Sequence, residues 1–203
     1  MKTLRTKTPD SGRRNFCPAA LALLLFAGAL GSPAAGQETP AAAAKAGSAS
    51  NDYSEIDKEV DQLADEIWDL ARNVWEFAEL GHEELKSSAY AGAMLKKHGF
   101  KISDRGIGGL ETAFIATWGS GSPTIGILVE YDALPGLGND TKPTKTPAPS
   151  GNPNGHGCGH NLICSTSVGA AVALKTHMEK KKLPGTLKVF GCPAEEKCAG
   201  KNY

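Results

Sequence analysis

Cys158 and His160 are two residues apart within the sequence GHGCGHN, which spans residues 155–161. In a turn or an extended segment, side chains at this spacing can converge on one ion. Cysteine thiolate and neutral imidazole are favoured ligands for zinc and related divalent metals. The glycines around them let the backbone turn sharply and approach an ion closely. A single Cys-x-His pair is weak evidence, so a metal site, a redox thiol and an ordinary turn all remain open at this point.

Two acidic groups follow apolar runs elsewhere in the chain. Asp132 comes directly after the run TIGILVEY, and Glu195 and Glu196 come shortly after LKVFGC. Carboxyl ends of parallel strands meet at one edge of a sheet, where ligands bind. A carboxylate such as Asp132 could accept the second imidazole proton of a histidine ligand. One of the paired glutamates could bind a metal while the other takes a proton from water, as metal-assisted amide hydrolysis requires. Such a pair is also common on solvated surfaces.

The cysteines allow a second interpretation. Cys158 and Cys164 have the same spacing as Cys192 and Cys198, which is compatible with disulfides in an exported protein. A structural zinc site with four cysteines is less compatible, because such sites prefer two to four intervening residues. Cys164 falls on a predicted helix, where it is expected to pack as a small apolar residue.

Helical and strand-like segments alternate along the chain. Apolar residues recur every three or four positions from Ile56 to Phe77, and further helices are predicted at 83–98 and 162–181. Strands are predicted at 111–118, 124–131 and 187–192, and the nearly continuous apolar run of the second suits a strand covered on both faces. The pattern predicts an α/β sandwich with a largely parallel central sheet. A long loop at 133–157 precedes the last helix, and loops of this length are often functional.

The N-terminal residues predict export. Residues 1–36 combine a basic segment, an apolar run at 16–30 and a small-residue segment, as a secretory signal does. The apolar run is shorter than the roughly 20 residues that a membrane span needs. Arg13 and Arg14 resemble a twin-arginine signal. We therefore expect a periplasmic or secreted protein with a linker at 37–52 and a domain at 53–203. The 22 basic and 22 acidic side chains leave no net charge, which argues against a nucleic-acid partner.

Taken together, three motifs carry a family resemblance. EYDALPGL at 130–137, GHGCGHN at 155–161, and GCPAEE at 191–196 followed by Gly200 and Lys201 resemble the metal-dependent aminoacylase and carboxypeptidase superfamily, in its aminobenzoyl-glutamate-like amidohydrolase branch. The resemblance extends over residues 53–203. It implies a zinc-peptidase-like catalytic domain that hydrolyses the amide bond of a small N-acyl or N-aroyl amino acid or a dipeptide-like substrate.

The resemblance also implies roles for individual residues. Cys158, His160 and Glu196 would bind a divalent metal, zinc or manganese, and Glu195 would be the general base that activates water. Asp132 would be a supporting carboxylate on the metal or substrate side. His156 matches a histidine of the motif that is not usually a ligand and would support the loop or the substrate.

One departure concerns length. Members of the superfamily are about twice as long, add a small domain used for homodimer formation, and take two further histidine ligands from their later parts. No histidine follows His177 in this chain. The expectation is therefore the N-terminal part of a longer, homodimeric enzyme. The alternative is a truncated, catalytically inactive remnant that binds only a metal or a partner chain.

Overall fold

The computed structural model describes residues 53–202. The predicted export signal at 1–36 and linker at 37–52 lie outside these described residues, so they stay predictions. No helix within residues 53–202 is long and apolar enough to cross a membrane.

The described chain contains helices followed by strands, and then a further helix and strand, rather than a strict alternation. In order, the elements are α1 (Ser54–Gln62), α2 (Ala64–Phe77), α3 (Leu85–Lys97), β1 (Lys101–Arg105), β2 (Phe114–Ser120), β3 (Thr124–Glu130), α4 (His160–Lys181), β4 (Gly185–Cys192) and the short α5 (Glu195–Cys198). Two single turns of 3-10 helix occupy Ile107–Gly109 and Gly200–Asn202.

The sheet has the strand order β1-β2-β4-β3, and the expectation of a largely parallel sheet is wrong. Strands β3 and β4 are parallel, whereas β1 with β2 and β2 with β4 are antiparallel. The reason lies in the connections. Helix α4 connects β3 to β4 and carries the chain back to the end of the sheet at which β3 began, so these two strands are parallel. By contrast, only residues 121–123 separate β2 from β3, and so short a connection reverses the direction of the chain. The fold class is therefore a mixed α/β fold.

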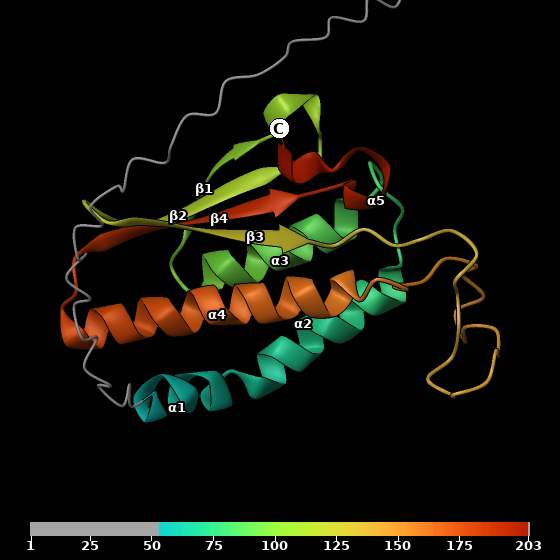
Figure 1. The fold of residues 1–203 in the computed structure, drawn as a ribbon, viewed down its shortest axis with the longest axis horizontal. Helices are drawn as coiled ribbons and strands as arrows, with labels where there is room; N and C mark the ends of the chain where they lie inside the picture. The colour runs from blue at the N-terminus through green and yellow to red at the C-terminus, as the bar shows by residue number, and fades with distance from the viewer. Residues whose placement is uncertain (1–52, 203) are drawn as a thin grey trace, which may run out of the picture. The chain divides into compact units, whose positions relative to one another are not determined.

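Helices α1 to α4 lie on one face of the sheet (Figure 1). Helices α3 and α4 pack on the strands, and α2 packs on α4 from outside. The core between them is apolar and includes Leu70, Leu95, Val168, Val172 and Val189. The predicted sandwich needs a second layer, which residues 53–202 do not supply, so that part of the expectation stays a prediction.

Strand β3 is less covered than its sequence suggests. It forms one edge of the sheet, and Ile125 and Leu128 are 39% and 48% exposed. Leu128 lies beside Phe190 of β4, which lies beside Ile115 of β2, so an apolar row crosses the sheet on the face opposite the helices. The continuous apolar run thus predicted the strand correctly. The expected cover on both faces is not found within the described residues, because the face of β3 opposite the helices is open there.

The first predicted helix is divided in two. The apolar period continues through Leu63, yet α1 ends at Gln62 and α2 begins at Ala64. The Leu63 amide donates to the Val60 carbonyl at 3.0 Å, a tighter turn than the α-helical one, while its side chain is buried. Both helices contact α4.

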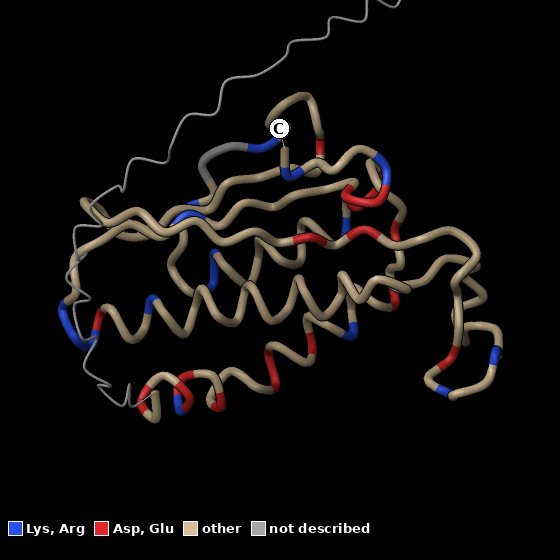
Figure 2. Tube along the Cα trace, in the orientation of Figure 1, with Lys and Arg blue, Asp and Glu red and all other residues tan. Residues whose placement is uncertain are grey.

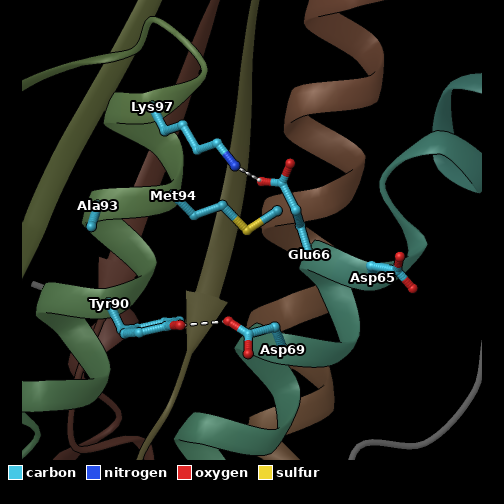
Figure 3. A pocket seen from close by; sticks show the side chains of 7 residues that line it. All are labelled: Asp65, Glu66, Asp69, Tyr90, Ala93, Met94 and Lys97. Atoms are coloured by element: carbon cyan, nitrogen blue, oxygen red, sulfur yellow. Dashed lines mark hydrogen bonds and ion pairs between the residues drawn. The ribbon is translucent and has the colours of Figure 1, made fainter.

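A cavity of about 420 Å³ lies between α2 and α3 (Figure 3). Its polar groups pair across it: the Tyr90 hydroxyl donates to Asp69 at 2.5 Å, and the Lys97 ammonium lies 3.0 Å from the Glu66 carboxylate. These contacts tie α2 to α3 on their exposed side. None of the metal-site candidates lines this cavity, so it is separate from the site described next.

Candidate metal centre

The predicted site residues come together where three elements meet. Asp132 follows the carboxyl end of β3, Glu195 and Glu196 begin α5 just after β4, and His160 is the first residue of α4. Figure 2 shows the acidic positions gathered at these strand ends and in α5. The parallel pairing of β3 with β4 places both strand ends at the same edge of the sheet, because β3 and β4 run in register from Thr124 beside Thr186 to Glu130 beside Cys192.

The long loop at 133–157 is fixed by backbone hydrogen bonds. The amides of Leu134 and Gly155 each donate to the other's carbonyl, at 2.9 and 3.0 Å. Gly159 then takes a left-handed conformation, with φ of 75°, immediately before α4. This conformation favours glycine. It turns the chain so that His160 enters the helix with its side chain buried.

Asp132 fixes the orientation of the His160 ring. The ring Nδ1 lies 3.0 Å from both the Asp132 carboxylate Oδ1 and the Asp132 carbonyl oxygen. Both of these partners are acceptors, so Nδ1 carries the proton. In the neutral ring, Nε2 therefore presents a lone pair on the other side. This is the arrangement that orients a histidine ligand toward a metal.

The lone pair of His160 Nε2 faces carboxylates. The ring nitrogen lies 3.5 Å from Glu130, 3.9 Å from Glu195 and 4.0 Å from Glu196. Ligand atoms of His160, Glu195 and Glu196 all lie within 4.8 Å of one another, a group that could hold a metal ion. Glu130 was not among the predicted site residues, although its place at the end of a strand was a usable signal.

The donor set fits a divalent cation. The Oε1 atom of Glu196 is buried and has no hydrogen-bond partner among the described residues. A buried carboxylate oxygen without a partner is costly unless a positive charge compensates it. Cys158 is exposed and lies outside the group of three, but its thiol contacts Glu196. That hydrogen bond to Glu196 raises the pKa of Cys158 above its ordinary value.

Opposing influences act on the Asp132–His160 pair. Burial alone would raise the pKa of Asp132, but hydrogen bonds from His160 and from the Glu196 amide outweigh it and lower that pKa. The hydrogen bond to Asp132 raises the pKa of His160, against the effect of burial. Asp132 is therefore the anionic partner that holds the imidazole in place.

Lys201 pairs with this acidic group. Its ammonium lies 2.9 Å from Glu130 Oε1 and 2.8 Å from Glu195 Oε1. Hydrogen bonds to these two carboxylates, Glu195 first, raise the pKa of Lys201 well above its usual range. The ammonium binds Oε1 of Glu195, and the other carboxylate oxygen, Oε2, lies on the side of His160. The sequence contained Lys201 within a recognised motif, but its contact with Glu195 depends on the fold.

His156 lies beside the site rather than in it. Its Nε2 lies 2.9 Å from the Val74 carbonyl, to which it donates. Asn152 and Asn161, on either side in the sequence, donate to carbonyls of Phe77 and Ala71. Three polar side chains around the Cys-x-His segment thus bind the C-terminal half of α2. This placement agrees with a supporting role for His156 in the loop.

The cysteine alternatives do not form in the described chain. All four cysteines between residues 53 and 202 are free. Cys164 is fully buried in the apolar core, and this burial raises its pKa to about 12. The prediction that it packs as a small apolar residue is confirmed, and the disulfide interpretation is wrong for these residues.

Glu84 is a buried polar residue that no sequence pattern singled out. It precedes α3, is 0% exposed, and accepts a hydrogen bond from the Ala194 amide at 2.7 Å. Nothing in a run of acidic residues at the start of a helix distinguishes a buried carboxylate from a solvated one.

Parts of this chain are similar in sequence to known proteins. Residues 126–203 match the sequence model of the Peptidase family M20/M25/M40. The chain is 38% identical over 125 residues to a subunit of the p-aminobenzoyl-glutamate hydrolase of Escherichia coli (strain K12), a match that covers 62% of this chain and 26% of that protein. It is also 38% identical over 102 residues to the Xaa-Arg dipeptidase of Mus musculus, covering 46% of this chain and 20% of the mouse protein.

A solved structure supports the fold. A dinuclear metal-binding peptidase of the M20 family from Bacillus subtilis superimposes with a TM-score of 0.54 and 24% identity, over 69% of this chain and 37% of that chain. The chain spans only about a quarter of the bacterial hydrolase subunit and a fifth of the dipeptidase. The matched residues 126–203 contain all five predicted site residues, and the resemblance in sequence is confirmed for this part.

Proposed function

We propose that this chain, whose residues 126–203 match the M20/M25/M40 peptidase family, forms the N-terminal part of the catalytic domain of a metal-dependent amidohydrolase. The observation that carries the proposal is the convergence of His160 Nε2, Glu195 and Glu196 within 4.8 Å, beside a buried Glu196 oxygen that lacks a partner among the described residues. The substrate class we propose is N-acyl or N-aroyl amino acids. It rests on similarity to a hydrolase of p-aminobenzoyl-glutamate.

His160 Nε2 and Glu196 Oε1 would hold the metal, zinc or manganese, with Cys158 joining them once its thiol is deprotonated. A bound divalent ion lowers the pKa of water and polarises an amide carbonyl. Deprotonation of Cys158 makes metal affinity rise with pH. Further ligands would come from parts of the protein outside this chain.

Glu195 is the proposed general base. Its Oε1 is held by Lys201, and its Oε2 lies on the side of His160. A carboxylate fixed by one oxygen can take a proton from water at the other and later deliver it to the leaving amine. Glu196 is not held by Lys201 but through its backbone amide, which donates to Asp132 Oδ2 at 2.9 Å. The two neighbouring glutamates can thus have separate tasks.

The test uses the protein expressed from its complete gene. Metal content is measured by mass spectrometry of the purified protein, and hydrolysis of a panel of N-acyl and N-aroyl amino acids is measured before and after treatment with a chelator. We expect turnover that the chelator abolishes and that added zinc or manganese restores. Full turnover in the metal-free protein would overturn the proposal, and metal binding without turnover would favour the inactive remnant.

Asp132 provides a first prediction by mutation. Replacing Asp132 with alanine removes the acceptor of His160 Nδ1 and the acceptor of the Glu196 amide at once. Partners that orient a metal-binding histidine typically contribute 10–100-fold to metal affinity, so we expect a loss of about that size by calorimetric titration. Asp57→Ala, at an exposed position of α1, is the control. Unchanged metal affinity in the Asp132 variant would contradict the assigned arrangement.

A further inference from the structure

Glu84 is a buried carboxylate whose hydrogen-bond partners are neutral. It is 0% exposed, its Oε1 accepts from the Ala194 amide at 2.7 Å, and its Oε2 accepts from the Thr112 hydroxyl at 2.9 Å. No ion pair within residues 53–202 includes Glu84. Burying a charge is costly unless its hydrogen bonds are satisfied. A side chain that serves only for packing would be apolar, so the hydrogen bonds of Glu84 need an explanation.

Ala194, whose amide donates to Glu84, has a strained backbone conformation. Ala194 is the last residue before α5 and has a left-handed conformation, with φ of 54°. A non-glycine residue keeps this conformation when its surroundings hold it there. The next two residues are Glu195 and Glu196, so the conformation of Ala194 sets the direction in which α5 starts and in which both carboxylates point.

A second contact joins the same two stretches of chain. We call residues 78–84 the α2–α3 connection and residues 193–198 the acidic segment. The Lys197 ammonium donates to the Gly81 carbonyl at 2.8 Å. A Cβ atom added to Gly81 would lie 2.9 Å from the Ala194 Cα atom, a distance at which something must shift. The α2–α3 connection therefore contacts the acidic segment so closely that residue 81 has no room for a side chain.

The acidic segment is also held from its other side. Asp132 Oδ2 accepts from the Glu196 amide at 2.9 Å, while the other Asp132 oxygen binds His160. Asp132 thus couples the segment to the imidazole, and Glu84 couples it to the α2–α3 connection. Without Glu84, the amide that starts the turn into α5 loses its acceptor. The hydrogen bond of the flexible Lys197 side chain to Gly81 then remains between the segment and the α2–α3 connection, and it does not fix the backbone at Ala194.

We propose that Glu84 is a positioning residue for the metal centre: by holding the Ala194 amide, it keeps Glu195 and Glu196 directed toward His160. This inference rests on the proposed function, and it assigns to Glu84 no contact with substrate or metal. Its hydrogen bonds, rather than its charge, are what the acidic segment requires.

Four variants of the protein expressed from its complete gene test the inference. Glu84→Ala removes the acceptor, whereas Glu84→Gln can still accept from Ala194 through its amide oxygen and donate to Thr112 through its amide nitrogen. Gly81→Ala leaves Glu84 intact and displaces the acidic segment by the close approach to Ala194. Glu83→Ala, at the exposed neighbouring glutamate, is the matched control.

We expect Glu84→Ala and Gly81→Ala to lower metal affinity by about 10–100-fold, the range for residues that support metal ligands. At saturating metal, kcat should fall while KM changes little, since no substrate contact is lost. Glu84→Gln should recover most of both values, and Glu83→Ala should match the wild type. Circular dichroism checks that each variant folds. If Glu84→Ala does not fold, the metal affinity and kcat of Gly81→Ala test the inference instead.

Two results would overturn the inference: wild-type metal affinity and kcat in both Glu84→Ala and Gly81→Ala, or a Glu84→Gln variant as impaired as Glu84→Ala. These results differ from those expected if the proposed function is wrong, because the wild-type protein itself would then show no metal-dependent hydrolysis. Metal affinity, measured by calorimetry on each variant, can be read whether or not the protein turns over a substrate.

Discussion

Replacing Glu195 with glutamine is expected to lower kcat by about 10²–10⁴-fold, the range that a positioned general base contributes. Glutamine has nearly the same shape and can still accept the hydrogen bond that Lys201 donates at 2.8 Å. It cannot take a proton from water. The variant should therefore fold and bind metal as the wild type does, and the loss should appear in kcat rather than in KM.

Glu196→Gln is the matched comparison, because it makes the same replacement of a carboxylate by an amide at the adjacent residue. We expect this variant to lose metal affinity, since an amide oxygen is a weaker ligand for a divalent ion than a carboxylate, and added metal should restore part of its turnover. Glu76→Gln, at an exposed position of α2, controls for the loss of one negative charge. If Glu195→Gln lost its metal and Glu196→Gln kept it, the two roles would be reversed.

Replacing His160 with asparagine is expected to weaken metal binding by more than about 100-fold, beyond the 10–100-fold typical of residues that only support a ligand. The asparagine amide nitrogen can occupy the place of Nδ1 and still donate to Asp132, which accepts from the ring at 3.0 Å. The Nε2 atom, which faces the glutamates, has no counterpart in asparagine. The substitution therefore removes the proposed ligand and retains the hydrogen bond that ties α4 to Asp132.

His177→Asn is the control, because His177 lies on the same helix and is not part of the candidate group. Metal titration by calorimetry gives the affinities, and thermal unfolding without added metal reports the stability of the fold. Equal affinities in the wild type and His160→Asn would show that the metal, if bound, lies elsewhere.

Local patterns in the sequence located most of the elements and selected the candidate residues of the site. The spacing of apolar residues located α2 and α4, the charges at its two ends and Gly99 located α3, and apolar runs located β2, β3 and β4. Cys158, His160, Glu195, Glu196 and Asp132 could be selected because metal ligation and proton transfer need these residue types near strand ends. Strand β1 was missed because KISDR has too few apolar residues to show a period, and the break at Leu63 was missed because the apolar period continues through it.

The tertiary structure decided what depends on contacts between distant parts of the chain. The sheet is mixed rather than largely parallel because the length of each connection, and not the composition of the strands, sets strand direction. The closeness of His160 to Glu130 and Glu195, and the pairing of Lys201 with both carboxylates, required β3, β4 and α4 to be packed together. Glu84 is the clearest case. The adjacent Glu83 is equally acidic and stays exposed, and only folding buries Glu84 against the Ala194 amide, 110 positions away.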